Sequence, residues 1–335
     1  MSGGVDSAVA ALLLKEAGYE VVGLTLALGW GPDAAPAAAA RVARELGVAH
    51  EVVPAAEPFR RLVLAPTARA YHQGLTPNPC AWCNARVKFP RLWARAASLG
   101  CQALATGHYA RLASGADGGK GLVEGADPAK GQAYFLARLG PRFLSRVRFP
   151  LGELTKEAVR ERARQAGLGA VERPESQDLC FLPPGGWQAF MTSFGPPRPG
   201  VVEDERGRVL AAHQGLHRFT VGQRRGLGVA LGYPAYVVAL DGPRAAVKVG
   251  PRSSLARRGL VGRQPRWFTD PGSAPELKVK IRYSHPGESC RVEPHPRGVT
   301  VMFTREQAGV APGQLAVFYD EDRVVGSAWI DKPIS

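Results

Sequence analysis

Residues 2–7 read Ser-Gly-Gly-Val-Asp-Ser and run directly into the helical stretch AVAALLLKEA at 8–17. Two glycines let the backbone fold so that successive N–H groups point at one anion, and the following helix N-terminus adds partial positive charge there. Ser2 and Ser7 add hydroxyl donors, and Asp6 can hold Mg²⁺ or cap the helix. The stretch therefore predicts a phosphate-binding loop rather than a glycine-rich turn that only starts a helix.

Apolar strands alternate with helices through the first half of the chain. Such alternation predicts an α/β fold with a parallel sheet covered on both faces, whose ligands sit at the carboxyl ends of the strands. Residues 74–84 are expected to be non-helical because they contain Pro77 and Pro79. The expected strands are 21–28, 49–53 and 101–106, the expected helices are 8–17, 35–46, 57–72, 86–99 and 155–166 with Thr155 as N-cap, and 114–131 is expected to be an exposed excursion.

The composition changes near residue 196, at the string GPPRPG. Beyond it, short alternating stretches predict strands at 236–240, 246–249, 277–283 and 299–303 and a hairpin around 320–322. This second half is expected to be all-β and to form two small barrels. The predicted domains are 1–197, 198–266 and 267–335.

The charge balance favours a polyanionic partner. The chain has 43 basic and 29 acidic residues, a net charge of +14. The excess is spread, with 22 − 16 = +6 over residues 1–197 and 21 − 13 = +8 over residues 198–335. A spread positive field suits a long polyanion such as RNA, and the alternative is a bias toward arginine with no RNA involved. The sequence has no run of about 18 apolar residues and no secretion signal, so we expect no membrane association and a cytoplasmic location.

The cysteines point to chemistry rather than to a disulfide framework. There are five, and an odd, sparse set in a long chain is not typical of disulfide-stabilised folds. Cys80 and Cys83 lie in the string TPNPCAWCNARVKF at 76–89, which also holds both asparagines of the chain. Three thiolates from Cys80, Cys83 and Cys180 could hold a [4Fe–4S] cluster, or two cysteines could carry sulfur as a persulfide and a nucleophile. Cys101 and Cys290 lie in or beside apolar strands and are expected to be buried structural residues.

The loop at 2–7 resembles the pyrophosphate loop of the N-type ATP pyrophosphatases, which adenylate a carbonyl oxygen and release pyrophosphate. In that group a strand should precede the loop, yet the sequence begins at Met1. Either the start is misassigned or the first strand is missing, which would leave the neighbouring strands without a partner.

Across its whole length the chain resembles the bacterial tRNA-specific 2-thiouridylase family, within a Cys-x-x-Cys subgroup. The matching strings are SGGVDS at 2–7, TPNPCAWCN at 76–84, ATGHYAR at 105–111, DPAKGQAYFL at 127–136, FPLGELTKEAVR at 149–160, ESQDLCF at 175–181, HQGLHRFTVGQRRGLGVA at 213–230, KIRYSHPG at 280–287 and APGQLAVFYD at 311–320.

The resemblance implies a fold, a reaction and partners. The fold is an ATP pyrophosphatase domain followed by a central β domain and a C-terminal β-barrel. The reaction is ATP-dependent adenylation of the wobble uridine (U34) O2 of tRNA and sulfur transfer to C2, which gives 2-thiouridine, AMP and pyrophosphate. The cofactors are ATP, Mg²⁺ and, as an alternative, a [4Fe–4S] cluster, and the partners are the tRNA anticodon loop and a cysteine desulfurase or sulfur-relay protein.

The resemblance also implies roles for individual residues. Cys83 matches the nucleophile and Cys180 the persulfide carrier, with a transient disulfide between them. The ATP site matches Met1, Ser2, Gly3, Gly4, Val5, Asp6, Ser7, Leu26 and Gly107. The tRNA contacts match Asn78, Pro79 and Cys80 at the target base, and His108, Lys130, Gly131, Gln132, Arg282, Tyr283 and Gln314 elsewhere.

Two positions depart from the family pattern. Many members carry Asp at the positions of Cys80 and Gly131. Cys80 cannot simply replace an Asp that acts as a general base or orients the catalytic cysteine. Gly131 lacks the polar group of an Asp, so the RNA contact at this position is in question. Two other functions are kept as alternatives. One is another tRNA-thiolating pyrophosphatase, such as a 4-thiouridine or 2-thiocytidine synthase. The other is a tRNA-binding protein that has lost catalysis because of its truncated start.

Overall fold

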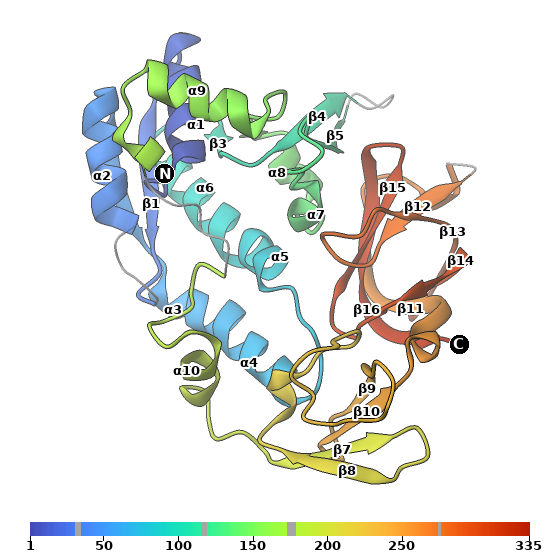
Figure 1. The fold of residues 1–335 in the computed structure, drawn as a ribbon. Coiled ribbons are helices and arrows are strands. Elements are labelled where there is room, and N and C mark those ends of the chain that lie inside the picture. The colour runs from blue at the N-terminus through green and yellow to red at the C-terminus, as the bar shows by residue number, and fades with distance from the viewer. Residues whose placement is uncertain (31–34, 115–118, 173–178, 274–275) are drawn as a thin grey trace. The chain divides into compact units, whose positions relative to one another are not determined.

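The fold is seen in a computed structural model, which describes residues 1–30, 35–114, 119–172, 179–273 and 276–335 (Figure 1). The chain divides into two compact units. Unit 1 comprises Met1–Val63, Cys80–Trp187 and Asp322–Val324, and unit 2 comprises Leu64–Pro79, Gln188–Glu321 and Val325–Ser335. Among the described residues, no helix combines the length and apolar character needed to cross a membrane.

Unit 1 has the expected α/β character, but its parallel strands form two pairs instead of one sheet. β1 (Val22–Ala27) pairs with β2 (Ala49–Pro54), and β3 (Leu104–Ala105) pairs with β6 (Val147–Arg148). No strand in the described part of the chain is hydrogen-bonded between β1 and β3. Met1 occupies part of this edge of β1, because its amino group donates to the Leu24 carbonyl and its own carbonyl accepts from Thr25 Oγ1 at 2.8 Å.

Three helices form a layer against these strands. Their shared core contains Val9 from α1, Val42 from α2 and Val159 from α9. Thr155 caps α9 as predicted, since its Oγ1 accepts from the Ala158 N–H at 3.2 Å. The helices of unit 1 and the segments next to them are α1 (Val5–Glu16), α2 (Ala35–Leu46), α3 (Ala56–Phe59), η1 (Arg60–Leu64), α5 (Pro79–Cys83), η2 (Asn84–Lys88), α6 (Phe89–Ser98), α7 (Ala133–Leu136), α8 (Pro141–Leu144), α9 (Lys156–Gln165), η3 (Gly169–Glu172) and α10 (Gly186–Thr192).

The prediction that residues 74–84 are non-helical is wrong from Pro79 onward. α5 begins at Pro79, and the helical path continues through the π-turn η2 into α6. Proline is tolerated at the first helical position because its missing N–H has no intrahelical partner there and its φ is already helical. The excursion expected at 114–131 contains a hairpin strand, because β4 (Ala110–Ser114) pairs with β5 (Lys120–Glu124).

Unit 2 holds the all-β half that the sequence predicts, together with α4 (Ala65–His72) and the short turns η4 (Leu216–Arg218), η5 (Arg252–Leu255) and η6 (Pro271–Ser273). The first β layer is a four-stranded sheet in the order β8 (Val209–His213), β7 (Gly200–Asp204), β10 (Ala246–Gly250) and β9 (Tyr236–Asp241). This sheet is open in the part of the chain described, so the expectation of a first barrel here is replaced by an open sheet. Its core includes Val202, Val237 and Val247.

The C-terminal sheet is the closed barrel that was expected. Six strands follow one another in the order β11, β14, β13, β12, β15 and β16, and β11 also pairs with β16, which closes the ring. Val279, Val301 and Phe318 belong to its fully buried interior. The strands are β11 (Ala256–Trp267), β12 (Leu277–Lys280), β13 (Glu288–His295), β14 (Gly298–Ala308), β15 (Leu315–Asp320) and β16 (Arg323–Ile334). The domain boundary expected between 266 and 267 lies inside this barrel, because it separates Trp267 from the rest of β11.

Candidate active site in unit 1

The predicted phosphate loop is present at the start of α1. Gly3 has φ +74°, and a Cβ there would come within 2.5 Å of the Ala38 Cβ, so only glycine fits. Ser7 organises the loop, because its Oγ accepts from the Ser2 N–H and donates to the Gly4 carbonyl, both at 3.0 Å. Gly4 is the N-cap and has no side chain to cap the helix, and Asp6 lies inside the helix as its second residue.

Gly107 lies directly against this loop. A Cβ on Gly107 would stand 2.8 Å from the carbonyl carbon and oxygen of Asp6 and 3.0 Å from the Ser7 nitrogen. Gly107 follows the end of β3, and Leu26 is a half-buried residue near the end of β1. The structure thus brings Gly107 to the loop, as expected of a strand end that faces a nucleotide.

The Asp6 carboxylate is held by two partners that the sequence analysis did not anticipate. Its Oδ1 accepts from the Tyr109 hydroxyl at 2.8 Å and from the Lys156 ammonium at 2.6 Å. The Lys156 side chain is only 7% exposed. One signal for Lys156 exists in the sequence: it is the first residue of a helix, where the helix dipole disfavours a cation.

Asp6 is compatible with the Mg²⁺ role expected of it. Both described contacts are made to Oδ1, which leaves Oδ2 for a cation. Mg²⁺ in nucleotide sites usually takes one or two carboxylates together with phosphate oxygens and water. A single carboxylate at the N-terminus of α1 therefore suits a metal ion that arrives with the nucleotide.

The helix α5 and the turn η2 present the cysteines. Cys80 and Cys83 lie three residues apart in α5, and all five cysteines of the chain are free thiols. Burial raises the pKa of Cys80 to about 11 and that of Cys83 to about 12, and it also raises the pKa of Cys180. The charge of Cys180 contributes to both of the first two shifts, so the three sulfurs lie within electrostatic range of one another. The structure thereby brings together the three cysteines singled out from the sequence.

Lys88 is the cation of this cluster, and sequence reasoning missed it. Its ammonium opposes the upward pKa shift of all three thiols, and its backbone N–H donates to the Cys83 sulfur. Lys88 ends η2, and π-turns of this kind are frequent at functional sites. Lys88 stands five residues after Cys83 in the string CNARVK, and this spacing was the signal available in the sequence.

His108 lies close to the same cation. Burial, followed by the charge of Lys88, holds the pKa of His108 well below its ordinary value, so the ring is neutral at pH 7. Its Nδ1 is 2.8 Å from Thr106 Oγ1, and its ring stacks on Phe89 at 5.9 Å. His108 is therefore a packed, neutral side chain between the phosphate loop and the cysteine helix.

The three cysteines do not form a metal site in this arrangement. Within the described residues, which include all three, no group of three His, Cys, Asp or Glu side chains could hold a metal ion. The described side chains therefore offer no preformed ligand group for a cluster, and the iron–sulfur alternative stays a prediction.

The residues expected to contact tRNA fall in both units. In unit 1, Gln132 Oε1 accepts from the Tyr109 N–H at 3.1 Å, and Lys130 lies in the turn just before Gln132. A Cβ on Gly131 would come within 2.5 Å of Glu124 Oε2, so an Asp at this position would require Glu124 to move.

In unit 2, Asn78 and Gln314 bind each other instead of standing free. Asn78 is buried and donates from Nδ2 to Gln314 Oε1 at 3.2 Å, while Pro79 follows it at the start of α5. Arg282 donates to the Ala308 carbonyl at 3.4 Å, and Tyr283 is 39% exposed.

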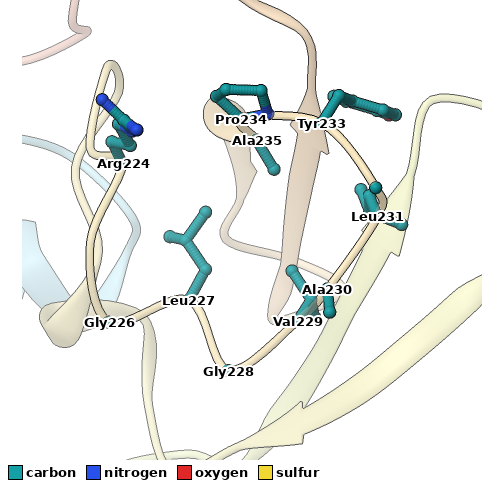
Figure 2. Close-up of a pocket in the computed structure, with 11 residues that line it drawn as sticks. Arg224, Gly226, Leu227, Gly228, Val229, Ala230, Leu231, Tyr233, Pro234 and Ala235 are labelled. Atoms are coloured by element: carbon teal, nitrogen blue, oxygen red, sulfur yellow. The ribbon is translucent and has the colours of Figure 1, made fainter.

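A hollow of about 750 Å³ lies within unit 2, in the loop between η4 and β9 (Figure 2). Arg224 and Tyr233 stand on opposite sides of the opening, and Leu227 points into it. The loop mixes glycines with apolar and aromatic side chains and is largely exposed. Its lining consists of Arg224, Gly226, Leu227, Gly228, Val229, Ala230, Leu231, Gly232, Tyr233, Pro234 and Ala235.

Comparison with protein families divides the chain into three matching segments. The tRNA methyl transferase HUP domain family matches residues 1–184, the tRNA methyl transferase PRC-barrel domain family matches residues 188–251, and the aminomethyltransferase beta-barrel domain family matches residues 257–330.

Curated relatives match nearly end to end. The tRNA-specific 2-thiouridylase MnmA of Syntrophotalea carbinolica is 44% identical over 98% of this chain and 97% of its own length. The protein of the same name from Magnetococcus marinus is 42% identical over 98% of this chain and 97% of its own, and that from Chloroflexus aggregans is 43% identical over 99% and 97%. With this identity over its full length, the chain belongs to the tRNA-specific 2-thiouridylase family, a family of tRNA sulfurtransferases.

Proposed function

We propose that this chain uses ATP to activate the wobble uridine of tRNA at O2 and then replaces that oxygen with sulfur. The observation that carries the proposal is that the phosphate loop and the three cysteines of unit 1 share the same neighbouring side chains. Gly107 packs against the phosphate loop and directly precedes His108. Lys88 lowers the pKa of His108 and opposes the upward pKa shifts of the three thiols, so two half-buried side chains connect the loop with the cysteines.

The first step is adenylation. The uracil O2 attacks the α-phosphate of ATP at the loop of residues 1–7, and pyrophosphate leaves. This attack turns a poor leaving oxygen into AMP. Leu26 and Gly107 flank the nucleotide in this proposal, and Mg²⁺, when bound through Asp6, neutralises phosphate charge.

The second step is sulfur transfer. The outer sulfur of a persulfide on Cys180 attacks C2, and AMP leaves with the former O2. The Cys83 thiolate attacks the inner sulfur of Cys180, which breaks the persulfide bond and leaves a Cys83–Cys180 disulfide. A thiol reductant then restores the two cysteines.

The exposure of the cysteines supports this division of roles. By surface area the Cys180 residue is exposed and Cys83 is half-buried, although the protein atoms around the Cys180 sulfur are dense enough to raise its pKa. An exposed carrier can receive sulfur from a cysteine desulfurase or a sulfur-relay protein, and a sheltered nucleophile is protected from other electrophiles. We place the reaction in the cytoplasm, where tRNA and ATP occur together. We retain 1–197 as the catalytic domain and move the boundary between the two β domains from 266 to just before β11, because that strand closes the C-terminal barrel.

The test is a thiolation assay with an unmodified tRNA transcript, ATP and a persulfide donor. 2-Thiouridine is quantified by mass spectrometry, and pyrophosphate release is followed in parallel. Cys83→Ser and Cys180→Ser should each abolish thiolation while retaining tRNA-dependent pyrophosphate release, and Cys101→Ser serves as the matched control. Thiolation that survives in both variants would refute the persulfide route.

A second readout separates the alternatives. Pyrophosphate release that needs no tRNA would remove the tRNA-modification function, and tRNA binding without any ATP turnover would indicate a binding protein. Near-stoichiometric iron and sulfide after anaerobic purification would replace the persulfide roles of Cys80, Cys83 and Cys180 with ligand roles.

A further inference from the structure

Lys156 is a buried cation in a position that its own helix disfavours. It is the first residue of α9, where the helix dipole opposes positive charge, and its side chain is 7% exposed. Removing an ammonium from water is costly unless an anion compensates for it. Among the described residues, Asp6 of the phosphate loop supplies a compensating anion 2.6 Å away.

The position of the Lys156 ammonium is set by its surroundings. Asp127 accepts from the Lys156 backbone N–H at 2.9 Å through Oδ2, and from the Ala129 N–H at 2.8 Å through Oδ1. The Lys156 ammonium also lies over the Tyr109 ring, 5.9 Å from its centroid, and Tyr109 donates to the same Asp6 oxygen. Backbone and side chain are both anchored, so the charge stays beside the loop.

Joining α9 to α1 does not by itself explain why Lys156 is buried beside the phosphate loop. The same two helices are already joined by Arg162 and Glu16, whose side chains are 41% and 45% exposed. A surface pair of that kind contributes little to stability. The pair of Lys156 and Asp6, whose side chains are 7% and 36% exposed, instead involves the second residue of α1, beside a helix N-terminus that can receive an anion.

We propose that Lys156 is the residue that binds the pyrophosphate part of ATP, exchanging Asp6 for the β- and γ-phosphate oxygens. This inference rests on the proposed function and deepens it. Asp6 would hold a metal ion bound together with the triphosphate, and that ion would supply further positive charge. Lys156 then neutralises the negative charge that collects on pyrophosphate as it leaves, which is where a fixed cation stabilises phosphoryl and nucleotidyl transfer.

The test measures binding by isothermal titration, with no tRNA and no sulfur donor. The probes are Mg²⁺ with a non-hydrolysable ATP analogue, Mg²⁺ with pyrophosphate, and AMP. Lys156→Gln should lower the affinity for the ATP analogue and for pyrophosphate at least tenfold, and it should change the affinity for AMP less than twofold. Arg162→Gln, which removes the exposed pair between the same helices, should leave all three unchanged.

Two outcomes would overturn the proposal: equal loss of AMP and ATP-analogue affinity in Lys156→Gln, or no loss of either. Lys156→Arg keeps the charge and the pairing with Asp6, so it tests the same point if Lys156→Gln does not fold. Lys156→Arg should bind AMP with the affinity of the parent chain, and its affinity for pyrophosphate should be within about fivefold of the parent's. If the parent chain itself binds no ATP analogue, the proposed function fails, whereas binding that is insensitive to Lys156 removes only this inference.

Discussion

Gly107→Ala tests whether the contact between β3 and the phosphate loop shapes the nucleotide site. The new Cβ would stand 2.8 Å from the carbonyl carbon and oxygen of Asp6 and 3.0 Å from the Ser7 nitrogen. Normal contacts of such atoms are near 3.4 Å, so backbone on one side must move by about half an ångström. Because neither neighbour is a flexible side chain, the strain cannot be relieved by a rotamer change.

Two magnitudes follow. Overpacking of this kind typically costs about 1–3 kcal/mol of stability. For a domain of the size of unit 1, each kcal/mol corresponds to about 2–4 °C in melting temperature. If the loop is the side that moves, its amides shift away from the phosphates, and the loss of one or two charge-assisted hydrogen bonds costs about 2 kcal/mol. That loss corresponds to about a thirtyfold weaker affinity for ATP.

The assay combines thermal unfolding with titration of an ATP analogue. Gly121→Ala is the matched control, because Gly121 lies in β5 of the same unit and its Cβ would meet nothing closer than 3.6 Å. We expect Gly107→Ala to lower both the melting temperature and the ATP affinity, and Gly121→Ala to change the affinity less than twofold. If Gly107→Ala matches Gly121→Ala in both measurements, the reasoning from the close approach is refuted.

Three further predictions follow from other contacts. Thr155→Ala removes the cap of α9 and should destabilise unit 1 by about 1 kcal/mol in urea unfolding, and a change below 0.3 kcal/mol would contradict the cap. Burial raises the pKa of Cys83 to about 12, and only the thiolate reacts, so its alkylation rate should rise about tenfold per pH unit from pH 7 to pH 11. A plateau near pH 9 would show an unshielded thiol. Arg224 and Arg225 are exposed neighbours on a chain of net charge +14, so replacing both with Ala should weaken tRNA binding and reduce its salt dependence by about two counterions. An unchanged slope would exclude both from contact with tRNA phosphates.

Local features of unit 1 were predictable because they depend on neighbours in the sequence. Helix 35–46 was expected and observed with the same bounds, and β1 and β2 lie within a residue of their expected ends. Gly3 adopts the positive φ that its turn requires, and Thr155 caps the helix that follows it. The error at Pro79 is also local in origin, since proline breaks a helix interior but suits a helix start.

The β half was predicted in class, and its closure was predicted correctly for the C-terminal barrel but wrongly for the four-stranded sheet. The strands alternate recognisably, so their approximate positions follow from the pattern of side chains. Whether a sheet closes depends on which strands meet, and the pairing of β11 with β16 joins segments at opposite ends of the C-terminal region. Strand alternation carries no information about such pairing.

The sequence alone determined the chemistry that is available: a glycine loop for phosphate, a pair of cysteines three residues apart and a third cysteine far downstream. Tertiary structure alone decided which groups act on one another. Asp6 and Lys156 are 150 residues apart in the chain and share an ion pair, and Lys88 influences a thiol on a separate segment, Cys180. The physical reason is that charge and burial act through space, so a side chain acquires its partner, and with it its role, only when the fold brings distant segments together.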